Sequence, residues 1–91
     1  MKPSVHTKTR QIANRLARIQ GHVSAVRGMV TQGRPCPDVL TQLAAVRAAL
    51  DQVGRLVLED HVAHCVVEAA RRGEARRTLA DLTTALQRFI G

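Results

Sequence analysis

The chain is short and basic, with 91 residues and a formal net charge of +7, and its one aromatic residue is Phe89. A core must therefore be aliphatic, and binding of single-stranded nucleic acid is disfavoured because base stacking needs aromatic rings. The sequence has no apolar run long enough to span a bilayer and no secretory signal, so we expect a cytoplasmic protein. A single small domain, residues 1–91, buries a limited core and often gains stability by forming an oligomer.

The first predicted element is a helix over about residues 5–32. Its aliphatic residues alternate at spacings of four and three positions, a heptad pattern that packs against a long neighbouring helix. The set comprises Ile12, Leu16, Ile19, Val23, Val26 and Val30. Gly33 and Pro35 then follow in the order typical of a helix end.

This first segment is also strongly basic, because no acidic residue precedes Asp38. The basic residues are Lys2, Lys8, Arg10, Arg15, Arg18, Arg27 and Arg34. An anionic membrane surface fits poorly, because the helix has no Trp or Phe anchor. Although a solvated face is the simpler alternative, this density of charge favours a polyanion such as double-stranded DNA.

The second predicted helix, about residues 37–72, begins with Pro37 in its first turn and Cys36 at its cap. It repeats the heptad pattern through Val39, Leu43, Val46, Leu50, Val53 and Val57. Gly54 inside this pattern indicates either close packing or a slight bend. A break at Gly73 precedes a third helix, about residues 75–90, whose apolar side carries Leu79, Leu82, Leu86 and Phe89. The fold class predicted is all-α.

Cys36, His61 and Cys65 continue the apolar stripe of the second helix at its two ends. His61 and Cys65 are four positions apart and share a helix face, whereas a continuous helix would hold Cys36 roughly 37 Å from His61. The three therefore form one site only if a second copy packs antiparallel, with a two-fold axis near Ala49 and Leu50. Small residues at Ala44, Ala45, Ala48 and Ala49 suit a close helix crossing there.

Two thiolates and one imidazole suit Cu(I), a soft ion that accepts three ligands, whereas zinc would need a fourth. If His6 joined these three residues as a fourth ligand, the site would suit Ni(II) and not Cu(I). For each residue alone, the simpler interpretation is a buried small cysteine or a core histidine. His22 and His64 lie off the stripe, so solvent or hydrogen-bonding roles are expected for both.

The sequence gives little support for an enzyme, because it lacks a Gly-rich phosphate loop and a Ser/His/Asp set. Asp60 is expected on a different helix face from His61. Two other functions compete with a metal-responsive DNA binder. One is a cytosolic copper-buffering or delivery protein, and the other is an architectural DNA binder with incidental cysteines.

The segments RLARIQGHV, CPDVLTQLAAVRAAL and VLEDHVAHCV closely resemble the copper-sensitive operon repressor family of bacterial metal sensors. This resemblance implies a three-helix protomer, an antiparallel four-helix-bundle dimer, and a homotetramer that is a dimer of dimers. It implies that the metal-free oligomer binds operator DNA and that Cu(I) releases it. The positions matching the family's intersubunit ligands are Cys36, His61 and Cys65. Asn14, Arg15 and Arg55 match its basic DNA-facing surface, beside which we place Lys8, Arg10 and Arg18.

Two positions depart from the family's copper branch. Pro35 stands where a tyrosine is common before the first cysteine, and Asp81 stands where a third-helix glutamate is common. The resemblance implies that the residues common at these positions in that branch make outer-shell contacts, which couple a metal site to its surroundings. Relatives that respond to nickel, formaldehyde or persulfide share the fold, so a nickel-responsive or thiol-reactive repressor is the alternative. The persulfide branch fits less well because it lacks the histidine that His61 supplies.

Overall fold

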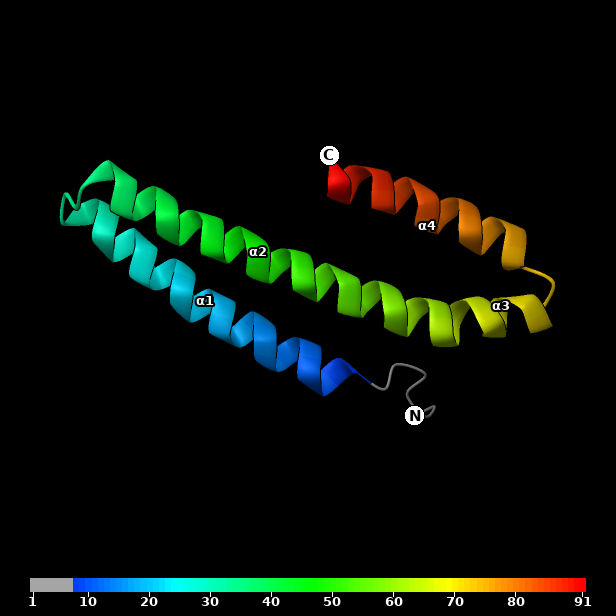
Figure 1. Cartoon of the computed structure of the whole chain (residues 1–91). Coiled ribbons are helices and arrows are strands. Elements are labelled where there is room, and N and C mark those ends of the chain that lie inside the picture. Colours follow the sequence, from blue (N-terminus) through cyan, green and yellow to red (C-terminus); the bar gives the residue numbers. More distant parts are fainter. Residues whose placement is uncertain (1–7) are drawn as a thin grey trace.

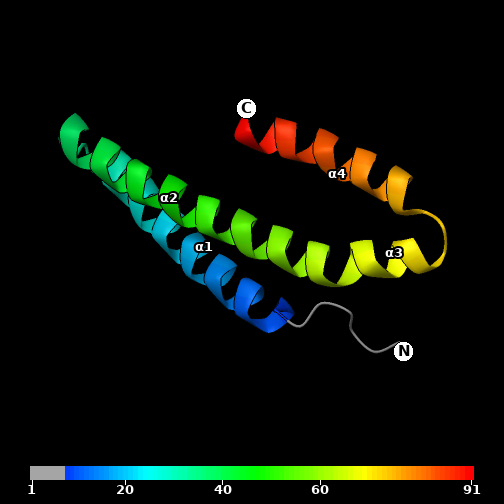
Figure 2. The ribbon, with the colours of Figure 1, turned by 45° about the vertical axis from the view of Figure 1, so that its right-hand side comes forward.

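The structure, a computed structural model, describes residues 8–91, with the side chain of Ala63 excepted, and is all-helical over that range (Figure 1). The all-α fold class is thus confirmed. The helices are α1 (Thr9–Thr31), α2 (Cys36–Asp60), the π-helix η1 (His61–Val66), α3 (Val67–Arg71) and α4 (Ala75–Ile90). α1 and α2 form an antiparallel hairpin, and α4 turns back along α2 on the side away from α1 (Figures 1 and 2). None of the helices in the described range is long and apolar enough to cross a membrane.

Glycine closes two helix ends with the same backbone motif. After α1, Gly33 has φ +71°, the Arg34 N–H donates to Met29 O at 3.0 Å, and the Gly33 N–H donates to Val30 O at 3.1 Å. This pair of bonds is the Schellman motif, which satisfies carbonyls that the helix leaves unpaired. Gly73, with φ +73°, ends α3 in the same way. The two turns set the antiparallel course of the chain.

α2 begins one residue earlier than expected. Pro35 is its N-cap, so Cys36 is the first helical residue and not the cap, and Pro37 follows within the first turn. Proline is tolerated there because the first N–H groups of a helix have no intrahelical acceptor. Asp38, also in the first turn, lies 3.7 Å from the guanidinium of Arg34 in an exposed ion pair.

Each heptad stripe divides into a buried half and an exposed half. Ile19 and Val26 of α1 and Val46 and Val53 of α2 form the buried core of the hairpin. Ile12, Val39 and Ala49 pack against this core. The alternate members of both stripes remain exposed, namely Leu16, Val23 and Val30 on α1 and Leu43, Leu50 and Val57 on α2. We call these six residues the apolar flank.

The apolar flank is exposed because one chain supplies only one layer of helices. The protomer measures 55 × 29 × 15 Å, and its shortest dimension is little more than the diameter of one helix, about 10–12 Å. Stable domains bury apolar faces between two packed layers. Of the four alanines expected at a helix crossing, Ala49 contacts the hairpin core, and Ala44, Ala45 and Ala48 are exposed.

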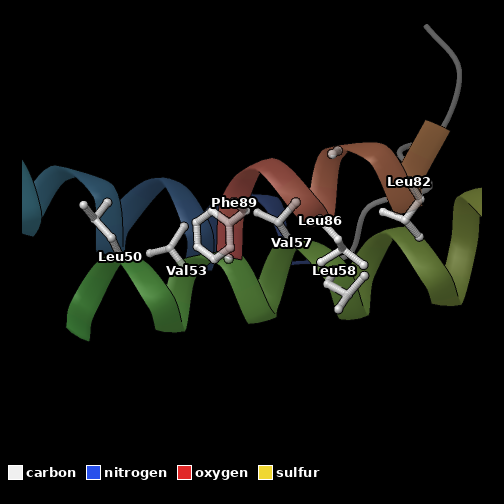
Figure 3. Close-up of a pocket in the computed structure, with 9 residues that line it drawn as sticks. Leu50, Val53, Val57, Leu58, Leu82, Leu86 and Phe89 are labelled. Carbon is white, nitrogen blue, oxygen red and sulfur yellow. The ribbon is translucent and has the colours of Figure 1, made fainter. Parts of the chain in front are cut away.

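α4 packs on α2 where the sequence places Gly54. A Cβ atom at Gly54 would lie 2.5 Å from Phe89 Cζ, so the glycine marks close packing. Figure 3 shows the Phe89 ring of α4 lying over α2. The contact borders an apolar hollow of about 390 Å³, whose lining residues include Leu50, Val57 and Leu86. The protomer therefore has a second apolar contact, between α2 and α4, on the side of α2 away from α1.

Two alanine substitutions in α1 and its turn should change stability in opposite directions. Gly33→Ala should lower the free energy of unfolding by about 1–2 kcal/mol, because a side chain disfavours the left-handed backbone there. Gly21→Ala should raise it by about 0.5–1 kcal/mol, because Gly21 is inside α1 and its added Cβ meets no atom within 4 Å. Urea unfolding followed by circular dichroism, at one protein concentration, measures both. A Gly33→Ala protein as stable as wild type would contradict the turn assignment.

Candidate metal centre and nucleic-acid surface

The candidate metal ligands lie at the two ends of α2. Cys36 is its exposed first residue, and half-buried His61 and Cys65 lie in η1, just beyond its last residue. The 25 residues of α2 rise about 37 Å, so Cys36 is far from the other two ligands. Within residues 8–91, no three His, Cys, Asp or Glu side chains of one chain are placed to hold a metal ion. The structure therefore brings His61 and Cys65 into one helical turn and leaves Cys36 apart.

Cys36 and His61 follow the apolar flank. Cys36, Leu43, Leu50 and Val57 recur every seven residues, and His61 comes four residues after Val57. Seven-residue and four-residue spacings keep side chains on one side of a helix. The donors at each end of α2 thus continue the row that one protomer leaves uncovered.

The π-helix η1 spans both His61 and Cys65. A π turn holds one more residue than an α turn, and such turns are frequent at functional sites. The sequence predicted an unbroken α-helix here, because residues 61–66 carry no glycine or proline to mark a change. Their spacing of about one turn still keeps the two side chains near each other along the helix.

Asp60, which the sequence places on a different helix face from His61, is a buried carboxylate, and this burial was not predicted. Its exposed fraction is 3%, and its Oδ1 lies 3.6 Å from Nε2 of His64. The heptad spacing could have predicted this burial, because Asp60 follows the core residues Val46 and Val53 at intervals of seven. This contact joins the end of the hairpin core to η1, which carries the candidate ligands.

His22, on α1, forms a 2.8 Å hydrogen bond with Gln42 of α2, as expected for a histidine beside the core.

The candidate outer-shell residue Asp81 and the departing position Pro35 lie apart within one chain. Asp81 is exposed on α4, a helix that contacts η1, and Pro35 caps the distant end of α2. The possible fourth ligand, His6, lies outside the described residues. The outer-shell role of Asp81 stays a prediction.

One edge of the hairpin gathers candidate DNA contacts from both helices. Lys8 Nζ lies 3.3 Å from Glu59 Oε1, and Arg15 donates a hydrogen bond of 3.1 Å to Gln52 Oε1. Arg15 and Arg55 line the same shallow hollow of about 220 Å³, together with Gln52, Leu56 and Glu59. We call Lys8, Arg15, Gln52, Arg55 and Glu59 the basic edge. The structure therefore brings Arg15 and Arg55 together although they are far apart in sequence.

The other candidate DNA contacts extend this surface over α1. Arg10, Asn14 and Arg18 are all exposed and recur at intervals of four. At about 100° per residue, these positions lie on the opposite side of α1 from Val23 and the rest of the apolar flank. α1 thus presents an aliphatic side and a basic side in different directions.

A second arginine cluster surrounds the turn between α3 and α4. It consists of Arg71, Arg72, Arg76 and Arg77, all exposed, and sequence reasoning did not single it out. Acidic neighbours offset part of its charge. Glu68 lies within 4.0 Å of the guanidinium groups of Arg71 and Arg72, and Glu74 lies 3.7 Å from Arg72 Nε.

Comparisons with known proteins agree on one family. The family model described as metal-sensitive transcriptional repressor matches residues 8–88. The chain is 40% identical over 79 residues to the copper-sensing transcriptional repressor CsoR of Bacillus subtilis, covering 87% of this chain and 78% of that protein. It is 38% identical over 80 residues to the copper-sensing transcriptional repressor RicR of Mycobacterium tuberculosis, covering 86% of this chain and 83% of that protein.

Two solved structures are also similar. The crystal structure of the copper-sensing repressor CsoR with Cu(I) from Geobacillus thermodenitrificans has a TM-score of 0.88 and 40% identity, covering 100% of this chain and 95% of that one. The nickel-responsive transcriptional regulator InrS has a TM-score of 0.74 and 47% identity, covering 98% of this chain and 99% of that one.

Proposed function

The chain belongs to the family of metal-sensitive transcriptional repressors, and on that basis we propose that it is a copper(I)-responsive repressor. In this proposal the metal-free oligomer binds operator DNA, and Cu(I) lowers its DNA affinity. The copper assignment is supported by the similarity to two copper-sensing repressors and to the crystal structure of a copper-sensing repressor with Cu(I).

The observation that carries the proposal is the placement of donors at opposite ends of one uncovered row. If two protomers pack antiparallel through their apolar flanks, Cys36 of each approaches His61 and Cys65 of the other. The two-fold axis then falls near Ala49 and Leu50, midway along α2. Each dimer would hold two such sites, and a dimer of dimers would hold four.

The donor chemistry fits Cu(I). Cys36 and Cys65 supply two soft sulfur ligands and His61 supplies an imidazole, a set that suits a three-coordinate soft ion. A structural zinc ion would need a fourth protein ligand. Cu(I), when bound, would supply the link that ties one protomer's α2 to the other protomer's η1.

DNA recognition is assigned to the basic side of the protomer. Arg15, Arg55 and Lys8 on the basic edge, with Arg10, Asn14 and Arg18 beside them, would contact phosphates of the duplex. Metal binding and DNA binding must oppose each other equally, so DNA weakens Cu(I) binding by the factor by which Cu(I) weakens DNA binding. Such couplings are typically about 1–3 kcal/mol.

A nickel-responsive repressor is the second candidate, favoured by the 47% identity to a nickel-responsive regulator. His6 would then join Cys36, His61 and Cys65 as a fourth ligand. Thiol-reactive repressors and a copper-buffering protein are the remaining alternatives. A buffering protein would bind Cu(I) with no salt-sensitive affinity for a specific duplex.

An anaerobic titration separates these functions. Metal-free protein is bound to a fluorescent duplex selected from random sequences, and Cu(I) or Ni(II) is added while anisotropy is followed. We expect Cu(I) to release the duplex with a roughly five- to 150-fold loss of affinity, as couplings of the usual size give. Release by Ni(II) and not by Cu(I) would replace the copper assignment with the nickel one. Retention of the duplex with both metals would contradict a metal-responsive repressor.

A further inference from the structure

Glu59 places a carboxylate inside the surface proposed to contact DNA. Its Oε1 lies 3.3 Å from Lys8 Nζ, and it lines the same hollow as Arg15 and Arg55. Among the described residues that line this hollow, Glu59 is the one acidic residue. A phosphate approaching Lys8 would therefore meet an anion already in contact with it.

The fold does not require this charge. The side chains of Lys8 and Glu59 are 37% and 62% exposed, and ion pairs so exposed contribute little to stability. The next contact along the basic edge has a neutral acceptor in place of a charged one. Seven residues further along α1, and seven residues earlier on α2, Arg15 is held by the neutral amide of Gln52. A neutral acceptor thus suffices to bridge the two helices on this edge.

We propose that Glu59 is an internal competitor of DNA phosphate for Lys8 and the neighbouring arginines, and that it limits the DNA affinity of the basic edge. This inference rests on the proposed repressor function. To bind DNA, Lys8 must exchange the Glu59 carboxylate for a phosphate, and the displaced carboxylate remains close to the DNA. Because phosphates carry no sequence information, Glu59 lowers affinity for operator and random duplexes alike.

The test compares Glu59→Gln with wild-type protein, both without metal, on the selected duplex and on a random duplex over a range of salt concentrations. Glutamine keeps the shape and an acceptor oxygen but removes the charge. For each protomer that contacts the DNA, we expect about 1.4- to five-fold tighter binding to both duplexes, the range that exposed ion pairs give. The slope of log affinity against log salt should steepen by up to about 0.9 for each phosphate newly neutralised.

Glu74→Gln is the matched control. Glu74 is also an exposed carboxylate, 56% exposed and 3.7 Å from Arg72, but it lies at the turn before α4. The Glu74→Gln substitution removes the same charge from the chain. Because Glu74 does not belong to the basic edge, the substitution should change DNA affinity much less than Glu59→Gln. Equal gains from the two variants would mean a general charge effect and would overturn the inference.

Lys8→Ala, made in both backgrounds, checks the mechanism. Its cost in DNA affinity should be larger in Glu59→Gln than in wild type, because only there is Lys8 fully available to phosphate. A loss of affinity in Glu59→Gln would instead mean that Glu59 orients Lys8 for DNA, and would also overturn the inference. If wild-type protein shows no salt-sensitive DNA binding, the repressor proposal fails as well, whereas the outcomes above leave that proposal intact.

Discussion

Cys36→Ala is expected to bind the selected duplex with wild-type affinity and to remain bound when Cu(I) is added. Cys36 is an exposed residue at the end of α2 remote from η1, so its loss should leave the hairpin and the basic edge unchanged. Without it, His61 and Cys65 are a two-ligand remnant that cannot link two protomers. Anaerobic anisotropy titration with Cu(I) measures the result. If Cys36→Ala still releases DNA on addition of copper, the ligand assignment is wrong.

A mixture of two inactive variants should recover part of the copper response. His61→Ala is expected to fail as Cys36→Ala does. In a mixed antiparallel dimer, however, intact Cys36 from one protomer meets intact His61 and Cys65 from the other, which restores one of the two sites. The variants are unfolded together and refolded, and Cu(I) binding and DNA release are compared with each variant treated alone. No recovery in a mixture that forms mixed dimers would contradict a shared site.

Leu50→Glu is expected to break the oligomer and, with it, both metal and DNA binding. Leu50 belongs to the apolar flank, is 41% exposed in one protomer, and lies near the proposed two-fold axis. Two introduced carboxylates would then face each other in an apolar interface, at a cost of several kcal/mol. Sedimentation equilibrium should show a monomer at concentrations where the wild-type protein is a dimer or tetramer.

Two further variants keep this test specific. Ala48→Glu adds the same charge to an exposed position that lies about 160° around α2 from Leu50, so its oligomeric state should match wild type. This position points away from the apolar flank, which corrects the expectation that Ala48 lies at the helix crossing. Leu50 also lines the hollow beneath Phe89, whereas Leu43 does not, so Leu43→Glu should dissociate the oligomer without disturbing α4. An unchanged oligomer in both glutamate variants of the flank would rule out this face as the interface.

The helix ends beside the turns could be predicted from sequence because their causes are local, whereas α1 begins at Thr9, later than the start near residue 5 that the sequence predicted. Gly33 and Gly73 supply the positive φ that ends α1 and α3, and the prolines around Cys36 restrict the chain at the start of α2. These requirements involve only a few neighbouring residues. The one-residue error at Cys36 reflects a cap whose contacts involve backbone groups alone.

The direction of each apolar residue could not be predicted in the same way. Periodicity shows that Ile19 and Val23 share a side of α1, but it cannot tell which one faces α2 of the same chain. The structure assigns Ile19 to the hairpin core and Val23 to the apolar flank. The burial of Asp60 was not predicted for a related reason, because an acidic residue at a buried heptad position contradicts the usual pattern of burial.

For the candidate site, sequence reasoning identified residue types better than it identified neighbours. Soft donors at Cys36, His61 and Cys65 are evident from chemistry, and their meeting across two chains remains a prediction. On the basic edge, the contacts of Gln52 and Glu59 depend on the register of α1 against α2, which no local pattern gives.

The wide turn of η1 affects where chains of this architecture can gain or lose a residue. Deleting one residue from an ordinary α-helix rotates everything beyond it by about 100°. Such a deletion within α2 would swing α4 away and separate Phe89 from Gly54. Between His61 and Val66 the backbone already holds a surplus residue, so a deletion there could be absorbed by closing the turn to regular α geometry. The fold should therefore tolerate a one-residue deletion in η1 outside the His61–Cys65 pair, and insertions or deletions at the two glycine turns, whereas both are excluded from the rest of the long helix.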